Sequence, residues 1–434
     1  MTARHLAAYL LEAAERAGDS PAYADAKGVR SYRDYRDESL RVAALLTDAG
    51  VVAGDRVCIA LPKGFPLYAT IHAALLVNAC YVPIDYTTPV ERGRAILTDA
   101  AARVLVTTGP NLTRLLGTDG DDKYDIAIVP LGPPGHGDAT AHRTVAWSAT
   151  PRSEPPGAGS LDPDAEAYVL YTSGSTGTPK GVVQSQRSAT AFAEWASVEL
   201  DLGPTDVVPQ VASVTFDLSV FDLFAATRAG ACLTPIAEGS MVSPVTFCRA
   251  VARSGATVLY CVPSLVLRET RGQAFAWQDL AGAGLRHIVF AGEPIDKPAL
   301  RRLRPQIPGV AIHNWFGPTE TNVCAFYRIS DADLAEEGPM PIGRPCPYAR
   351  FEYAWDAPDG QEPPTGELLV AGDTVLSAYW QRPAETSERI LARDGERFFR
   401  TGDYVHFNHR CDLVFVGRRD RRVEPDDDPP RRAG

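Results

Sequence analysis

Apolar and polar positions alternate along most of the chain in a pattern that predicts strands followed by helices. An apolar run of strand length at 57–62 (VCIALP) precedes a helical pattern at 68–79, and 257–263 (TVLYCVP) and 285–294 (LRHIVFAGEP) contain further runs of this kind. This alternation is typical of βαβ units, in which helices cover both faces of a parallel sheet. Ligands of such folds bind beyond the carboxyl ends of the strands.

From about residue 340 the pattern changes to short strands such as 366–372 (GELLVAG) and 412–417 (DLVFVG), which predicts a small barrel or sandwich. The segment 130–164 is rich in Pro, Gly and polar residues and separates two sheet-forming halves. We therefore predict an α/β protein with two doubly wound subdomains and a small β-barrel subdomain. The expected divisions are 1–155, 156–338 and 339–420, followed by a disordered tail at 421–434.

Composition and charge exclude several classes of function. The 434 residues include 43 Lys and Arg against 54 Asp and Glu, a net charge of −11, whereas nucleic-acid binding needs a basic face. No stretch approaches the ~18 uninterrupted apolar residues that span a bilayer, and the N-terminus lacks the apolar core of a signal peptide. The eight cysteines are scattered, which indicates reduced thiols. We expect a cytoplasmic protein that binds neither membranes nor nucleic acid.

A loop of small residues from Thr172 to Gly181 (TSGSTGTPKG) is the strongest local signal for chemistry. It follows a strand predicted at 167–172 and is expected to precede a helix. Small residues let backbone N–H groups approach phosphate oxygens, hydroxyls add donors, and Lys180 adds positive charge. Because Gly follows Lys180, the loop is not a Walker A motif. A flexible surface linker is the alternative, but the flanking elements favour ligand binding.

This loop and seven further motifs resemble those of the adenylate-forming superfamily, which includes acyl- and aryl-CoA ligases, luciferases and the adenylation domains of nonribosomal peptide synthetases. The signature YTSGSTGTPKG begins at Tyr171, and all the motifs stand in the family's order. The others are SYRDY (31–35), NACYVPID (78–85), FDLS (216–219), NWFGPTE (314–320), GELLVAGDTVLSAYW (366–380), FRTGD (399–403) and GRRDRRV (417–423).

The resemblance implies that ATP and Mg²⁺ bind at these motifs. Asn314 and Phe316 would frame the adenine, and Asp403 would accept hydrogen bonds from the ribose. Glu320, with Thr176, would hold Mg²⁺ on the ATP phosphates. The implied catalytic residues are Thr176, Lys180 and Glu320, and the implied ATP contacts are Thr172, Ser173, Gly174, Ser175, Thr176, Gly177, Lys180, Gly292, Glu293, Asn314, Trp315, Phe316, Gly317, Thr319, Asp403 and Arg418.

The FDLS motif favours an amino acid over an acyl or aryl acid as the substrate. In the peptide-synthetase branch the Asp of this motif faces the substrate α-ammonium group, which implies that role for Asp217. A desolvated Asp would be costly in an acyl- or aryl-CoA ligase, although Asp217 could instead cap a helix that begins near Ser219. The implied pocket consists of Phe216, Asp217, Leu218, Phe221, Tyr260, Val289, Ala291, Trp315, Val323 and Cys324.

Apart from Asp217 this pocket carries no charge, so it favours a small, mostly apolar amino acid. The set is similar to that of free-standing enzymes that load L-proline, and proline is the expected substrate. Phe221, Val289 and especially Trp315 depart from that set, and they could shrink the site towards a smaller amino acid.

The match to the family fails after Val423, where members continue into a lid domain that carries a catalytic Lys. We therefore expect slow adenylation and a thioester step that needs this domain in trans. The expected partner is a separate carrier protein with a phosphopantetheine thiol, and an MbtH-like helper is a further candidate. An acyl- or aryl-CoA ligase and a ligand-binding pseudoenzyme remain as alternatives. His406 and His409 are interpreted as surface histidines, not as a metal pair.

Overall fold

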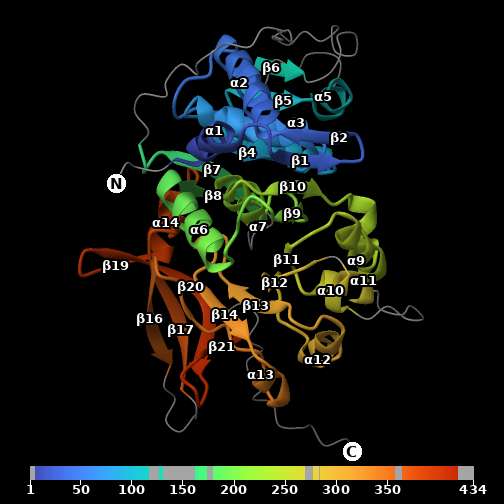
Figure 1. Ribbon diagram of the computed structural model, residues 1–434. Coiled ribbons are helices and arrows are strands. Elements are labelled where there is room, and N and C mark those ends of the chain that lie inside the picture. The colour runs from blue at the N-terminus through green and yellow to red at the C-terminus, as the bar shows by residue number, and fades with distance from the viewer. Residues whose placement is uncertain are drawn as a thin grey trace, which may run out of the picture.

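The computed structural model describes residues 5–116, 127–130, 162–173, 179–268, 277–282, 284–356 and 364–418. These residues form four sheets with helices packed between and around them. Figure 1 shows the first part of the chain at the top, the helix-covered middle part below and to the right, and the antiparallel C-terminal part at the lower left. The predicted tail at 421–434 lies outside the described residues.

A seven-stranded sheet, in the order β18-β8-β7-β4-β3-β5-β6, forms the largest layer. Strands β3 to β7 run parallel, whereas β8 and β18 are antiparallel to their neighbours. The strands are β3 (Arg56–Ala60), β4 (Cys80–Pro83), β5 (Val104–Thr107), β6 (Ala127–Pro130), β7 (Glu166–Ser173), β8 (Pro179–Ser185) and β18 (Ala378–Tyr379). The helices along this part of the chain are α1 (Leu6–Ala17), α2 (Tyr32–Asp48), α3 (Phe65–Leu76), α4 (Val90–Asp99), α5 (Gly109–Leu116) and α6 (Gln186–Glu199).

A second sheet, in the order β2-β1-β10-β9, joins the N-terminal hairpin to the middle of the chain. Its strands are β1 (Pro21–Asp25), β2 (Gly28–Ser31), β9 (Val207–Gln210) and β10 (Cys232–Pro235). Between β9 and β10 the chain forms α7 (Leu218–Val220), a π-helical turn (Phe221–Ala225) and α8 (Ala226–Ala229).

The third sheet, β11-β12-β13-β14-β15, is parallel over its first three strands and antiparallel over the rest. Its strands are β11 (Val258–Cys261), β12 (His287–Phe290), β13 (Ala311–Phe316), β14 (Ala325–Ile329) and β15 (Arg344–Pro345). The helical segments around it are a 3₁₀ turn (Glu238–Val242), α9 (Pro244–Arg253), α10 (Ser264–Leu267), α11 (Trp277–Ala281), α12 (Lys297–Leu303), a 3₁₀ turn (Arg304–Gln306) and α13 (Asp331–Ala335).

The fourth sheet is antiparallel, as the short-strand pattern predicts. Its order is β16-β17-β20-β19, with β21 paired to β20. The elements are β16 (Ala349–Asp356), β17 (Thr365–Gly372), α14 (Pro383–Arg389), β19 (Ile390–Arg393), β20 (Glu396–Phe407) and β21 (Leu413–Arg418).

The predicted α/β class with a small β subdomain is confirmed. Two sheets draw strands from both sides of residue 155, and β18 adds a strand from the third segment to the largest sheet. Because strands from different divisions share these sheets, the expected boundaries at 155 and 338 do not separate the sheets from one another. They stay a proposal.

The prediction of a helix directly after the phosphate loop is wrong. Residues 179–185 form β8, and α6 begins only at Gln186, where the Ser185 side chain caps the helix by accepting from the Ser188 N–H group. The β-branched pair Val182 and Val183 favours a strand, and antiparallel pairing with β7 fixes it. The phosphate loop therefore connects two antiparallel strands and does not lead into a helix N-terminus.

Candidate active site

Three neighbouring strands supply the wall of the candidate substrate pocket. Tyr260 in β11 is the cross-strand partner of Val289 in β12, and Trp315 in β13 points to the same face because side chains alternate along a strand. The Phe221 ring completes the wall, with its centroid 5.1 Å from the Tyr260 ring and 6.0 Å from the Trp315 ring. All four side chains are fully buried and form a mostly apolar wall.

The remaining predicted pocket residues divide into three groups. Ala291 and Val323 are buried in the same hydrophobic cluster as the wall, and the half-buried Leu218 packs against that cluster. Cys324 is also buried, but it packs with the core of the β subdomain. Phe216 is 60% exposed, so its ring does not join the pocket wall. The structure therefore brings the predicted wall residues together and leaves the Phe216 ring outside that wall, and the substrate-binding roles of all of them stay predictions.

Asp217 lies where α7 begins, and its side chain makes no capping hydrogen bond. The alternative that Asp217 is a helix cap is therefore not realised. Burial raises the pKa of the Asp217 carboxyl to about 6, and the charge of Glu320 adds to this, while backbone N–H groups oppose it. Within the described ranges, no lysine, arginine or histidine contributes to that pKa shift or pairs with the carboxyl. In the described part of the chain, Asp217 is thus a half-buried acid without a cation beside it.

The loop that carries Asp217 is held by residues to which the sequence gave no role. The Asp85 carboxylate accepts a 2.7 Å hydrogen bond from the Ser213 hydroxyl, and Lys63 donates to the Val211 carbonyl at 2.7 Å. The buried carboxylate of Asp222 accepts from the Val211 N–H group at 3.3 Å. Asp85 belongs to the NACYVPID motif, so the sequence indicates that this residue matters. Only the fold shows that the Asp85 side chain contacts the loop that carries Asp217.

Lys180 lies at one end of the phosphate loop, directly across from Thr172 in the β7–β8 pair. The Thr172 hydroxyl donates to the Lys180 carbonyl at 3.4 Å, which ties the two strands together. The Lys180 ammonium group pairs with Glu385 of α14 at 2.5 Å. Because Glu385 is an anion on the surface beside the loop, phosphate would have to compete with it for Lys180.

Several predicted ATP contacts cannot be placed. Gly174, Ser175, Thr176 and Gly177 lie outside the described residues, and the side chain of Ser173 does as well. The roles assigned to them stay predictions.

The end of β13 and the loop after it carry the residues expected at the adenine and the metal. Asn314 is buried and donates through its side-chain amide to the Pro341 carbonyl at 2.8 Å, and the Phe316 ring lies 5.7 Å from the Phe415 ring. A Cβ atom at Gly317 would lie 1.7 Å from the Asn322 carbonyl oxygen, so only glycine allows this loop to fold back. In this arrangement Glu320 is close enough for its charge to act on the Asp217 carboxyl.

Two more predicted ATP residues already have partners in the protein. The Glu293 carboxylate accepts from the backbone and side chain of Ser264 at 3.0 and 3.1 Å, directly after Gly292, which has a positive φ of 81°. The Thr319 carbonyl accepts from the Gln184 side chain at 3.1 Å. Both residues therefore help to fix loops at the site.

The predicted ribose residues lie together on the β subdomain. Asp403 in β20 is the cross-strand partner of Arg418 in β21, and their side chains form a 3.4 Å ion pair. Asp403 is buried, and its backbone N–H group donates to the Thr401 hydroxyl at 2.9 Å. The FRTGD motif therefore holds the Asp403 carboxylate in place, and its role toward the ribose stays a prediction.

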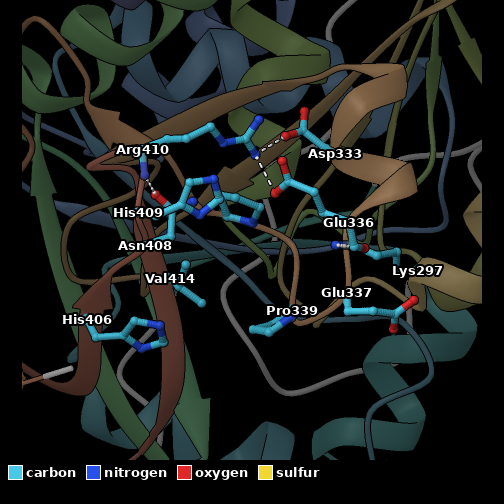
Figure 2. Close-up of a pocket in the computed structure, with 11 residues that line it drawn as sticks. Lys297, Asp333, Glu336, Glu337, Pro339, His406, Asn408, His409, Arg410 and Val414 are labelled. Carbon is cyan, nitrogen blue, oxygen red and sulfur yellow. Dashed lines mark hydrogen bonds and ion pairs between the residues drawn. The ribbon is translucent and has the colours of Figure 1, made fainter. Parts of the chain in front are cut away.

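A separate pocket lies where the β20–β21 turn meets α12 and α13. Figure 2 shows the Arg410 guanidinium group between Asp333 and Glu336. It pairs with the buried Asp333 carboxylate and lies 3.4 Å from Glu336. His406 and His409 line the same pocket, but Figure 2 shows their rings apart from one another. These contacts fasten the β subdomain to the third sheet.

The family model described as "AMP-binding enzyme" matches residues 10–380. The chain belongs to this AMP-binding enzyme family. The family predicted from the motifs is thus confirmed. No helix among the described residues has the length and apolar character needed to cross a membrane.

Known relatives of this family member include two named ligases. The L-proline–[L-prolyl-carrier protein] ligase of Streptomyces coelicolor is 37% identical over 401 residues, which cover 91% of this chain and 74% of that protein. The enzyme with the same name from Pseudomonas fluorescens is 32% identical over 403 residues, covering 92% and 76%. The crystal structure of IdnL7 matches with a TM-score of 0.81 at 28% identity, covering 97% of this chain and 83% of that one.

Proposed function

We propose that this AMP-binding enzyme activates an amino acid as its aminoacyl-adenylate for loading onto a carrier protein. The observation that carries the proposal is Asp217, a desolvated carboxyl beside an apolar pocket, without a cationic partner in the described structure. A carboxylate in such surroundings is stabilised by a cation. The α-ammonium group of an amino acid supplies that charge, whereas an acyl or aryl acid does not.

The arrangement of residues supports adenylate formation. A carboxylate oxygen of the amino acid attacks the α-phosphorus of ATP, the bond to the oxygen between the α- and β-phosphates breaks, and pyrophosphate leaves. Asp217 would hold the ammonium group while the aromatic wall excludes water from the side chain. Lys180 would offset negative charge on the phosphates, and Asp403 would hold the ribose.

The described donors fit Mg²⁺ bound largely by the nucleotide. Among the described residues, no cluster of three or more His, Cys, Asp or Glu side chains could hold a metal. A single carboxylate such as Glu320 suffices for Mg²⁺, which keeps several waters and uses substrate phosphates as ligands. When bound, the ion would neutralise charge that develops on the phosphates.

L-Proline is the amino acid that we propose as substrate. Protonated proline keeps two N–H donors on its ring nitrogen, so Asp217 can pair with it. Four buried side chains, Phe221, Tyr260, Val289 and Trp315, form a mostly apolar surface that suits its ring. The names of the two related ligases support the same choice.

These names also support a carrier-protein thiol as the acceptor in a second step, in which the sulfur attacks the acyl carbon and AMP leaves. An MbtH-like helper remains a candidate partner.

Amino-acid binding should depend on pH through Asp217. Because the pKa of Asp217 is raised to about 6, the carboxyl is protonated below that pH and cannot pair with an ammonium group. Affinity for the amino acid should therefore rise about tenfold between pH 5 and pH 7 and then level off. The facing phenols of Tyr168 and Tyr260 have raised pKa values and stay neutral in this range, and the charge of Glu320 also acts on the Asp217 carboxyl.

Calorimetric titration at several pH values checks this expectation, with Asp217→Asn as the control. The Asn side chain does not titrate, so its affinity should be low and constant from pH 5 to pH 7. An equal pH dependence in both proteins would assign the titration to another group.

Amino-acid-dependent ATP–pyrophosphate exchange tests the proposed function. A panel of L-proline, alanine, valine and simple aryl acids should give exchange with proline above the others. Exchange with the aryl acids alone would favour the acyl- or aryl-CoA ligase alternative. ATP binding without exchange for any acid would favour a ligand-binding protein without turnover.

A further inference from the structure

Tyr379 contacts both of the charged residues that the proposed function places on the ATP phosphates. Its hydroxyl donates a 2.7 Å hydrogen bond to the Glu320 carboxylate. The Lys180 ammonium group lies 4.2 Å from the centre of its ring, close enough for a cation–π interaction. The side chain is buried, so the ring lies between a fixed cation and a fixed anion.

The backbone around Tyr379 fastens the same two loops. The Leu376 N–H group donates to the Glu320 carbonyl at 2.7 Å, and the Trp380 N–H group donates to the Gly181 carbonyl at 2.8 Å. Between these bonds, β18 pairs with β8. A Cβ atom at Gly181 would lie 2.7 Å from Val169 and 3.1 Å from Trp380, so glycine permits this close approach. The segment 376–380 therefore bridges the Glu320 loop and the phosphate-loop hairpin.

We propose that Tyr379 is a positioning residue that keeps Lys180 and Glu320 apart and oriented for ATP and its metal. This rests on the roles of Lys180 and Glu320 in the proposed function. Opposite charges at the ends of two loops attract each other, and a direct ion pair would neutralise both groups before the nucleotide arrives. The ring prevents that contact and binds each group through a different part of the same side chain. In the structure Lys180 pairs with Glu385 instead of Glu320.

The hydroxyl also restricts the carboxylate. A hydrogen bond to one oxygen of Glu320 fixes the plane of the carboxylate and leaves the other oxygen for a cation. Without the hydroxyl, Glu320 has more rotamers to lose when it binds a metal. The Tyr379 hydroxyl should therefore strengthen ATP binding in the presence of Mg²⁺ and have no effect on ATP binding in its absence.

Tyr379→Phe tests this, because it keeps the ring over Lys180 and removes only the donor to Glu320. ATP binding is measured by calorimetry while the MgCl₂ concentration is varied. The Mg²⁺ concentration for half-maximal binding should rise about five- to tenfold, the range that one hydrogen bond to a carboxylate accounts for. Affinity measured in EDTA should not change.

Tyr23→Phe is the matched control, since the Tyr23 hydroxyl donates to the Asp25 carboxylate at 2.8 Å in the β1–β2 hairpin. It should leave the Mg²⁺ dependence at the wild-type value. A Tyr379→Phe protein with wild-type Mg²⁺ dependence would overturn the proposal. So would an equal effect of Tyr379→Phe in wild type and in a Glu320→Ala background, which has no acceptor for the hydroxyl, because the hydroxyl would then act through another group.

The same titrations separate the failure of this proposal from that of the proposed function. If Glu320→Gln raises the Mg²⁺ requirement and Tyr379→Phe does not, only the role of Tyr379 is wrong. If Glu320→Gln leaves the Mg²⁺ requirement unchanged, the assigned ATP site is wrong, and the role of Tyr379 is wrong with it.

Discussion

Replacing Asp217 with alanine is expected to lower amino-acid-dependent pyrophosphate exchange by about 10²–10³-fold, because breaking a buried ion pair from one side costs about 3–5 kcal/mol. The loss should be this large because the aromatic wall excludes water, which could otherwise solvate the ammonium group. It should appear mainly in the affinity for the amino acid, since Asp217 would hold the ground state as well as the transition state.

The same variant should bind ATP normally, which separates a lost substrate contact from a lost fold. Asp19→Ala is a suitable control, because Asp19 is a highly exposed acid paired with Arg33 and should leave exchange unchanged. If Asp217→Ala kept full exchange with proline, the ammonium contact would be disproved. If it kept exchange with an aryl acid but lost proline, the amino-acid role would be confirmed.

Replacing Glu320 with glutamine should lower the rate of adenylate formation by about 10²–10³-fold, the usual cost of losing one group that stabilises transition-state charge. Glutamine has the same shape and can still accept the hydrogen bond from Tyr379, so the loop should stay in place. The negative charge is what disappears. Single-turnover formation of the adenylate at saturating substrates measures this step directly.

Two controls define that result. Glu352→Gln changes a partly exposed acid paired with Arg393 and should leave the rate unchanged. Raising the Mg²⁺ concentration should restore part of the rate of Glu320→Gln, because weaker metal binding is one cause of the loss. An unchanged rate at ordinary Mg²⁺ concentrations would contradict the role of Glu320.

Much of the fold could be predicted from the sequence because its signals are local. Strands such as β3 and β5 are short apolar runs buried on both faces, which is the pattern of a central parallel strand. The strand β8 was mistaken for a helix because its residues, PKGVVQS, form a strand through pairing with β7, and periodicity over seven residues does not show a partner.

Motifs in the sequence indicate which residues belong to the candidate site. They do not indicate the contacts that these residues make with distant segments of the chain. The pocket wall came from motif positions, and the structure brings Phe221, Tyr260 and Trp315 into contact. The contact of Lys180 with Glu385 and Tyr379 joins residues about 200 positions apart, so no local pattern indicates it. The exposure of the Phe216 ring was equally invisible in the motif, because the motif does not show to which side each residue points.

The most direct test of the central claim is a binding comparison of two adenylate analogues that differ only in the amine. Both carry a sulfamate in place of the phosphate, one with a prolyl group and one with a cyclopentanecarbonyl group. Wild-type protein should bind the prolyl analogue at least about 10²-fold more tightly, and Asp217→Asn should abolish most of that difference. Equal binding of the two analogues by the wild-type protein would contradict the claim that this enzyme recognises an amino acid through Asp217.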